Sequence, residues 1–291
     1  MLTQAAVVRR EGAPFTIEEI ELAEPREGEM RVRIVACGVC HTDEKVRIGY
    51  FTPLPAVLGH EGAGIVEKLG PGVEGFSEGD HVVLSYPACG TCDNCRRGKP
   101  FYCYSSTRLS FGGRFQDGHT PLSKDGEPIN CFFGQSSFAT HAVVPVFNAV
   151  RVDPDIDLRL LAPLGCGIQT GAGAIVNALR PGAGDSVAIF GTGTVGLSAI
   201  MAASIAGCGK IIAVDILESR LQIAREYGAT EVINSAAESD VPACVRELTG
   251  GNGADFALDT TGVEICTLNA LKSMHTGARG ACVAASRRIT L

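Results

Sequence analysis

The segment VAIFGTGTVG, residues 187–196, constrains the fold more than any other part of the chain. Its apolar start predicts a buried strand, which is followed by Gly191, Gly193 and Gly196 in the spacing G-x-G-x-x-G. Gly191 permits a tight turn, Gly193 lets a pyrophosphate approach the backbone, and Gly196 lets the next helix pack closely on the strand. The N-terminus of that helix offers free N–H groups to phosphate. The segment therefore predicts a dinucleotide-binding α/β fold.

A second apolar run, IIAVD, ends at Asp215 and is predicted to be the neighbouring strand. A carboxylate at this place can accept hydrogen bonds from the ribose hydroxyls of an adenosine, and it repels a 2′-phosphate. We therefore expect NAD rather than NADP. The alternative is a glycine turn in an α/β domain that binds no nucleotide.

The chain after about residue 165 alternates strands with helices. The helical segment SRLQIAREYGAT is expected to end at Gly228, and the segment from Val241 to Leu248 carries one apolar face. Strands that alternate with helices imply a doubly wound parallel sheet covered on both faces. The predicted strands are Val187–Phe190, Ile211–Asp215, Glu231–Ile233, Phe256–Asp259 and Ala281–Ala284.

The first half of the chain has a different pattern. Short Val- and Ile-rich runs, such as MRVRIVACGV and DHVVLS, alternate with Gly and Pro turns, which is typical of an irregular β-rich region. A chain of 291 residues is long enough for two domains that each bury a core. We expect a β-rich domain at 1–164 and a Rossmann domain at 165–291.

The charge and the apolar segments exclude some classes of partner. A net charge of −7 argues against nucleic acid, because a phosphate-binding surface needs an excess of Lys and Arg. The run from Ser186 to Gly209 is uncharged and long enough to cross a bilayer, but a strand, a glycine turn and a helix explain it better. We expect no membrane association. The N-terminus has no apolar core of signal-peptide length, so a cytoplasmic location is expected.

Four of the 12 cysteines lie close together in CGTCDNCRRGKPFYC. Their spacing, C-x2-C-x2-C-x7-C, lets one loop wrap four thiolates around a tetrahedral ion, which is typical of structural zinc. Iron–sulfur ligation uses the same residue type, and four unrelated free thiols are a third possibility. The four residues are Cys89, Cys92, Cys95 and Cys103.

A second possible ligand set is spread along the sequence. Cys40, His60 and Cys166 each lie where a strand or an apolar segment meets a glycine turn. Two thiolates and one imidazole form the Cys2His set of a catalytic zinc, which leaves a fourth position for water or substrate. A lone histidine in an apolar segment is more often a buried core residue, so the other motifs carry this prediction.

These motifs together resemble a known family. GHEGAGIVEKLGPGV, residues 59–73, fits the signature G-H-E-x2-G-x5-G-x2-V of the zinc-containing alcohol dehydrogenases, in the medium-chain dehydrogenase/reductase superfamily. The cysteine loop is similar to the structural zinc lobe of that family, and GTGTVG with Asp215 is similar to its NAD site. The segment GCGIQTGAGA, residues 165–174, most resembles the aryl-alcohol (benzyl alcohol) dehydrogenases.

The resemblance implies a GroES-like catalytic domain, a Rossmann domain and two zinc ions per chain. It implies that Cys40, His60 and Cys166 hold the catalytic zinc, with Glu61 close behind it. The four-cysteine lobe holds the structural zinc. Asp43 would hydrogen-bond the far nitrogen of His60, as the carboxylates behind zinc ligands do. Thr42 would take the proton of the alcohol, and Lys45 stands where many members have a histidine that ends the proton relay.

The resemblance also implies further cofactor contacts. His41 would contact the pyrophosphate and Arg220 would lie near the adenosine, while Thr170 and Val195 complete the cofactor-binding set. The implied reaction oxidises a primary, aromatic alcohol to the aldehyde by hydride transfer to NAD. Small alcohols and aldehydes would be the partners, together with further copies of the chain in a dimer or tetramer.

The end of the sequence differs from the family. Members usually continue with a sixth strand of the nucleotide sheet and a segment that returns to the catalytic domain, whereas this chain ends in SRRITL. We therefore expect an incomplete Rossmann domain. Two alternatives stay open: an S-(hydroxymethyl)glutathione dehydrogenase, and a truncated homologue that binds zinc and nucleotide without catalysis.

Overall fold

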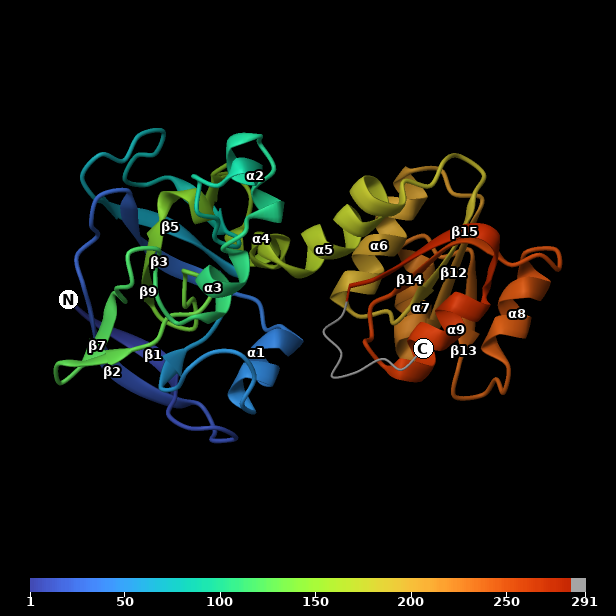
Figure 1. Ribbon diagram of the computed structural model, residues 1–291, viewed down its shortest axis with the longest axis horizontal. Coiled ribbons are helices and arrows are strands. Elements are labelled where there is room, and N and C mark those ends of the chain that lie inside the picture. Colours follow the sequence, from blue (N-terminus) through green and yellow to red (C-terminus); the bar gives the residue numbers. More distant parts are fainter. Residues whose placement is uncertain (284–291) are drawn as a thin grey trace. The chain divides into compact units, whose positions relative to one another are not determined.

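The computed structural model describes residues 1–283. The chain divides into two compact units, Met1–Cys166 and Gly167–Leu291, each with its own sheets and core (Figure 1). The first unit is β-rich and the second alternates strands and helices, as the sequence predicts.

The first unit contains a five-stranded antiparallel sheet in the order β4-β1-β2-β7-β8. Alternate residues of its long strands point into one core, where Val7 and Ile20 are fully buried. Its strands are β1 (Leu2–Val8), β2 (Thr16–Leu22), β4 (Ala56–Val57), β7 (Leu122–Lys124) and β8 (Glu127–Ile129).

A second antiparallel sheet of this unit has the order β10-β6-β5-β3-β9. The predicted Val- and Ile-rich runs form β3 and β6, and their residues Val32 and Leu84 are buried in a shared core. The predicted metal ligands lie next to the start of β5 and the end of β6. The strands are β3 (Glu29–Cys37), β5 (Gly62–Leu69), β6 (His81–Leu84), β9 (His141–Pro145) and β10 (Ala149–Arg151).

Short helices connect these strands. Helix α1 is held by Val46, which is buried against Val8 and Leu58. The remaining helices of the unit begin and end within a few residues, as expected for connections between strands. The helices of this unit are α1 (His41–Arg47), α2 (Asp93–Arg96), η1 (Pro100–Tyr102), α3 (Ser106–Phe111), η2 (Val146–Asn148), α4 (Leu158–Leu161) and η3 (Ala162–Gly165).

The second unit contains a parallel five-stranded sheet in the order β13-β12-β11-β14-β15. The strand order reverses between β11 and β14, and ligands of such sheets bind beyond the carboxyl ends of the strands at this point. Four of the five predicted strands are confirmed to within two residues. The strands are β11 (Ser186–Phe190), β12 (Lys210–Asp215), β13 (Glu231–Asn234), β14 (Ala254–Asp259) and β15 (Met274–Cys282).

Both faces of this sheet are covered by helices (Figure 1). In β11, Val187 and Ile189 face a core formed with α6, α7 and η4, while Ala188 and Phe190 face a core formed with α8 and α9. Hydrophobic residues on both faces explain the continuous apolar letters of the strand. The helices are α5 (Gly167–Gly173), η4 (Ala174–Leu179), α6 (Thr194–Ile205), α7 (Glu218–Glu226), α8 (Val241–Leu248) and α9 (Glu264–Lys272).

The predicted strand Ala281–Ala284 was wrong at its start. The strand begins at Met274, and Ala284 lies outside the described residues. In the described part, β15 is the last strand of this sheet, and most of its side chains are not buried. Its first residues, MHTGARG, therefore lack the apolar pattern of a buried strand. Its pairing with β14 is also irregular between Ala254 and Phe256.

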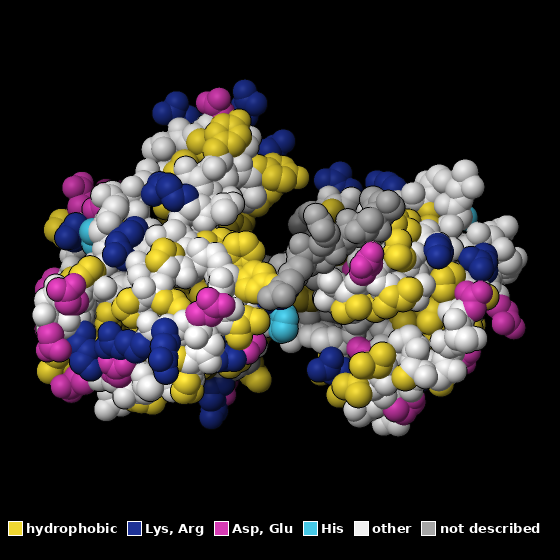
Figure 2. All heavy atoms as spheres, turned by 60° about the horizontal axis from the view of Figure 1, so that its bottom comes forward, with side chains coloured by type: hydrophobic (Ala, Val, Ile, Leu, Met, Phe, Trp, Pro, Cys, Tyr) yellow, Lys and Arg dark blue, Asp and Glu magenta, His cyan; other side chains and the backbone are white. Residues whose placement is uncertain are grey.

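Surface and membrane features complete the description. Within residues 1–283 no single helix is long and apolar enough to cross a membrane, and one bent pair, Leu158–Gly165 with Gly167–Leu179, could do so by length and composition only. Charges of both signs are interspersed on the face shown in Figure 2. One exposed ion pair of the first unit joins Lys68 Nζ to a Glu24 carboxylate oxygen at 2.7 Å.

Candidate active site and metal centres

Three segments of the first unit bring the predicted catalytic ligands together. Cys40 precedes the first residue of α1, His60 and Glu61 directly precede β5, and Cys166 follows η3. One ligand atom from each of these four residues lies within 4.8 Å of every other. The set therefore has the spacing needed to surround one ion, with side chains from sequence positions as far apart as 40 and 166.

Asp43 connects two of these ligands. The residue is 1% exposed, and its Oδ1 accepts hydrogen bonds from the amide of Gly59 at 3.0 Å and from Nδ1 of His60 at 3.1 Å. Its Oδ2 accepts a hydrogen bond from the amide of Cys40 at 3.0 Å. One carboxylate thus holds the backbone at both ligands and keeps the proton of the imidazole on Nδ1.

The other ring nitrogen of His60 indicates a metal ligand. Nε2 is buried and has no hydrogen-bond partner in the part of the chain that the structure describes. An unpaired buried polar atom is costly, and with the proton on Nδ1 this nitrogen carries a free lone pair. Two sulfurs beside that lone pair form a donor set that fits zinc. The residues present therefore fit the expected catalytic ion.

The pKa shifts of the predicted zinc ligands also favour a bound cation. The Cys166 thiol and the His60 ring lower the pKa of Cys40 to about 3, although burial opposes this shift. The Cys40 thiolate, burial and Glu61 together raise the pKa of Cys166. Burial lowers the pKa of His60, but Asp43 and Cys40 outweigh it and raise the pKa to about 9, so an ion that binds Nε2 takes the place of a proton there. A cation among these groups would relieve the repulsion between negative charges, as metal binding does for thiolates.

Gly38 makes room for Glu61, and the sequence reasoning missed it. A Cβ atom at Gly38 would lie 1.9 Å from Oε2 of Glu61, so any larger residue would displace that carboxylate. The signal was present in the letters ACGVC, where a glycine directly follows β3, two residues before Cys40.

The expected proton acceptor lies beside the ligand set. Oγ1 of Thr42 is 3.7 Å from Sγ of Cys40, and the side chain is half-buried. His41 is the first residue of α1 and its side chain is exposed. Helix α1 therefore carries Thr42 and Asp43 on the side of the ligands and His41 on the surface.

A row of phenylalanines, which we call the phenylalanine row (Phe133, Phe111 and Phe51), leads away from His60. Phe133 stacks on the His60 ring at 4.6 Å between centroids, and Phe111 lies 5.1 Å from both Phe133 and Phe51. Phe51 is 61% exposed. Phe51 and Phe133 both have positive φ, at 65° and 51°, which is unfavourable for residues of this size and concentrates at functional sites. No periodic pattern in the sequence indicates this row.

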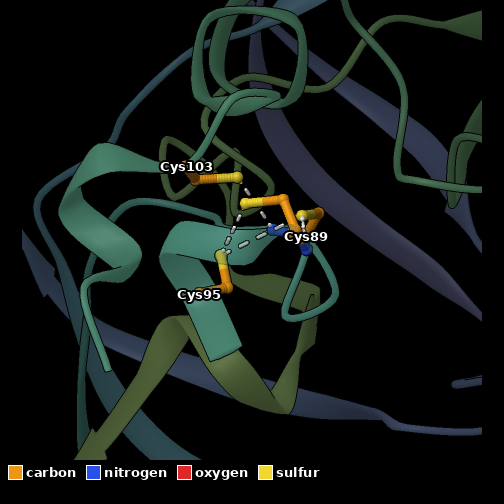
Figure 3. Close-up of side chains that lie close together, drawn as sticks. Cys89, Cys95 and Cys103 are labelled. Carbon is orange, nitrogen blue, oxygen red and sulfur yellow. Dashed lines mark hydrogen bonds between the residues drawn. The ribbon is translucent and has the colours of Figure 1, made fainter. Parts of the chain in front are cut away.

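The four-cysteine lobe forms a second potential metal centre. The sulfurs of Cys89, Cys92, Cys95 and Cys103 all lie within 4.8 Å of one another, and those of Cys92 and Cys95 are 3.5 Å apart. Figure 3 shows the side chains of Cys89, Cys95 and Cys103 directed toward one another. None of the 12 cysteines, which all lie in the described residues, forms a disulfide, so no disulfide competes with metal binding here.

Backbone amides of the lobe point at its sulfurs. The amide of Cys92 donates to Cys89 Sγ and the amide of Cys89 donates to Cys103 Sγ, both at 3.3 Å. Amides, first that of Thr91, lower the pKa of Cys89 to about 6, whereas partial burial and Cys92 raise the pKa of Cys95 to about 12. Four sulfurs leave no open position, which is typical of a structural zinc site.

The glycine turn of the second unit follows β11 and leads into α6. Gly191 has φ +89°, which L-residues rarely adopt. A Cβ atom at Gly196 would lie 1.8 Å from the carbonyl oxygen of Gly191, so this glycine permits the close contact between helix and turn. Nothing lies within 4 Å of the corresponding position at Gly193, where the backbone is open to a ligand. Each glycine thus has the property that the motif requires.

Asp215 lies at the end of β12 beside this turn. Its Oδ2 accepts hydrogen bonds from the amide and the hydroxyl of Thr192, both at 2.8 Å. Its Oδ1 accepts from the amides of Ile216 at 2.8 Å and Leu217 at 3.0 Å. Burial opposes ionisation, but these donors, first those of Thr192, lower the pKa of Asp215. The residue expected to bind ribose is therefore held as a carboxylate by the chain itself.

The remaining expected cofactor residues of this unit lie on three helices. Thr170 is on α5, half-buried, next to Gly171, whose missing Cβ would lie 2.0 Å from the carbonyl oxygen of Val195. Val195 is therefore in the first turn of α6 and near α5. Arg220 is exposed on α7, the helix that follows Asp215.

Two family profiles match the chain. Residues 26–154 match the profile described as the alcohol dehydrogenase GroES-like domain, and residues 194–289 match the profile described as zinc-binding dehydrogenase. The two matches fall in different units of the structure.

Relatives and solved structures agree with these profiles. A geraniol dehydrogenase of Castellaniella defragrans is 47% identical over 89% of this chain and 70% of its own length. The crystal structure of benzyl alcohol dehydrogenase from Acinetobacter calcoaceticus has a TM-score of 0.94 and 44% identity, covering 100% of this chain and 79% of that one. An alcohol dehydrogenase zinc-binding domain protein from Burkholderia ambifaria has a TM-score of 0.95 and 49% identity over the same shares. From its sequence, its two-unit fold and these relatives, the chain belongs to the zinc-containing alcohol dehydrogenase family.

Proposed function

We propose that the chain oxidises a primary aromatic alcohol to its aldehyde, with NAD as the hydride acceptor and two zinc ions per chain. The observation that carries this proposal is the cluster of Cys40, buried His60 and Cys166, in which Nε2 of His60 has no partner within residues 1–283 and its ring stacks on the phenylalanine row.

The catalytic roles follow from the chemistry of this set. A zinc ion bound there would supply Lewis acidity, which lets an alcohol lose its proton near neutral pH. Thr42 accepts that proton and passes its own hydroxyl proton on towards solvent, since its hydroxyl lies next to Cys40 and can both accept and donate. Asp43 keeps Nδ1 of His60 protonated, which would leave Nε2 as the nitrogen that holds the ion. NAD, when bound, would supply the hydride acceptor, so that the carbinol C–H bond breaks and a carbonyl forms as the alcohol proton leaves.

The cofactor roles belong to the second unit. The turn from Gly191 to Gly196 and the first amides of α6 bind the pyrophosphate. Asp215 accepts hydrogen bonds from the adenosine ribose and disfavours a 2′-phosphate, which supports NAD over NADP. Asp215 already accepts four hydrogen bonds from its own chain, and they hold the carboxylate in place before the ribose arrives.

The substrate class rests on the phenylalanine row. Aromatic rings pack favourably against one another, so a benzylic ring can continue the row from His60 toward exposed Phe51. The relatives are named for benzyl alcohol and geraniol, which are both primary alcohols with an sp² carbon next to the carbinol carbon. An apolar row also offers nothing to the charged groups of a glutathione adduct.

An initial-rate screen with a metal count tests the proposal. We expect about two zinc ions per chain and higher kcat/KM for benzyl alcohol than for ethanol or S-(hydroxymethyl)glutathione, with NAD preferred over NADP. Phe51→Ala should lower the preference for benzyl alcohol over ethanol, because it removes the exposed ring of the row. Phe101→Ala, an exposed aromatic of the lobe, is the matched control.

Other outcomes would separate the alternatives. NADH binding without turnover of any alcohol would indicate a homologue that has lost catalysis. A preference for the glutathione adduct would contradict the aromatic substrate but not the zinc site.

A further inference from the structure

Gln135 is a buried amide that neither the motifs nor the proposed chemistry uses. It lies between β8 and β9, is 1% exposed, and forms four hydrogen bonds. Its Nε2 donates to the carbonyls of His60 at 3.1 Å and Ser85 at 3.0 Å. Its Oε1 accepts from the amide of Gly62 at 3.1 Å and the hydroxyl of Ser137 at 2.7 Å. Donor and acceptor atoms of this amide are therefore both occupied.

The side chain continues a backbone ladder across the ligand turn. The amides of Phe138 and Ser137 donate to the carbonyls of Leu58 and Gly59, at 3.0 and 2.9 Å. Beyond Gly59 the Gln135 side-chain amide takes over the pairing, because it binds the backbone on both sides of Glu61. It thus acts on His60 and Glu61 as the peptide group of a neighbouring strand would.

The close approach requires a glycine at position 62. A Cβ atom there would lie 2.2 Å from Oγ of Ser137 and 3.1 Å from Oε1 of Gln135. A larger residue would therefore push the amide away from the ligand turn. The contact is tight enough to transmit a small displacement of Gln135 to the backbone of Glu61.

The same amide reaches the segment of the second thiolate. It binds the carbonyl of Ser85, directly after β6, and the hydroxyl of Ser85 lies 3.5 Å from the carbonyl of Gly165. Gly165 precedes Cys166 and packs against the end of β6, where a Cβ would lie 2.0 Å from the Leu84 carbonyl oxygen. Gln135 therefore connects the backbone of one predicted ligand to the support of another.

We propose that Gln135 is a positioning residue for the catalytic metal centre, which fixes the spacing of His60, Glu61 and Cys166. The proposal rests on the catalytic zinc of the proposed function. Buried groups behind metal ligands typically change metal affinity about 10- to 100-fold when removed. Asp43 bonds the ring of His60 as well as backbone amides, whereas within the ligand turn Gln135 bonds only the backbone.

Release of zinc to a chelator, followed with a metal indicator, tests the role of Gln135. The wild-type protein should release two zinc ions, one from each centre. Gln135→Met keeps the length of the side chain and removes all four hydrogen bonds, so one zinc should leave roughly 10- to 100-fold faster while the other is unchanged. Gln135→Asn keeps the amide on a shorter side chain and should give an intermediate rate, which matters if the methionine variant does not fold.

Two control variants separate positioning from general stability. Asn130→Leu removes another buried amide of the same unit, whose Nδ2 donates to the Pro55 carbonyl at 2.9 Å, and should lower the melting temperature without faster zinc release. Ser137→Ala removes only one bond of Gln135 and should release zinc almost as the wild type does. Wild-type release rates in both Gln135 variants, or equally fast release in Asn130→Leu, would overturn the proposal. A wild-type protein with zinc in the lobe alone would overturn the proposed function as well.

Discussion

The hydrogen bond from the Thr192 hydroxyl to Asp215 gives a direct test of how the cofactor carboxylate is held. Thr192→Val has nearly the same shape but removes the hydroxyl that lies 2.8 Å from Oδ2, while the Thr192 amide stays in place. A hydrogen bond to a charged group contributes about 1.5–3 kcal/mol, so the free energy of unfolding should fall by about this amount at neutral pH. Without this hydrogen bond the Asp215 carboxylate is held less firmly for the ribose, so the dissociation constant for NADH should rise about tenfold, which corresponds to about 1.4 kcal/mol.

The pH dependence of this variant follows from the lowered pKa of Asp215. A carboxyl with a depressed folded pKa stabilises the protein above its ordinary pKa of 3.8, and this stability is lost as pH falls through the folded pKa. The difference between variant and wild type should therefore be largest near neutral pH and should shrink in acid. Urea unfolding followed by circular dichroism measures it, and Thr192→Ser, which keeps the hydroxyl, should restore most of the stability.

The binding measurement is simple because the chain contains no tryptophan. NADH fluorescence can be titrated directly, without energy transfer from indole rings. Equal unfolding curves and equal NADH affinity for Thr192→Val and wild type would refute the view that this hydroxyl holds Asp215.

Three further predictions concern other parts of the chain. His60→Ala should abolish alcohol oxidation and leave NADH binding unchanged, and an alcohol-dependent absorbance assay beside the titration would detect any remaining turnover. Cys95→Ser should remove one zinc per chain and lower the melting temperature, and a variant that still binds two ions would contradict the lobe assignment. The Thr276 carbonyl and Asp255 raise the pKa of His275, so its stabilising effect is present in acid and is lost as pH rises through the folded pKa. The melting temperature of His275→Gln should therefore depend less on pH between about 6 and 9 than that of the wild type.

The fold could be predicted well at positions where only one residue type satisfies the local geometry. Gly191 and Gly196 can be identified without a structure, because a positive φ and a close carbonyl exclude side chains. The start of β15 could not be predicted, since MHTGARG carries no apolar pattern and its pairing depends on β14. The expected dimer or tetramer stays a prediction.

The candidate site was predictable in its ligands and not in their support. Cysteine and histidine have few roles in such a pattern, so Cys40 and His60 stood out from the sequence. Gln135 did not, because a glutamine in a loop is usually exposed, and only the folded chain shows that it pairs with the His60 carbonyl. The donors around Asp215 were missed for the same reason: three of the four are backbone amides, which have no signature in the letters.

The carboxylate of Asp43 implies that the catalytic ligand set and the cysteine lobe differ in how they bind a metal ion. It accepts hydrogen bonds from the amides of Cys40 and Gly59 and from the His60 ring, so contacts within the protein hold the catalytic ligand set in place. The cysteine lobe has sulfurs facing sulfurs, and its aromatic side chains Phe101, Tyr102 and Tyr104 are exposed, so its shape depends far more on what it encloses. Mild chelation should consequently leave an empty but shaped pocket at one centre and a collapsed loop at the other, and reloading should be a rapid docking event in the first and a refolding event in the second.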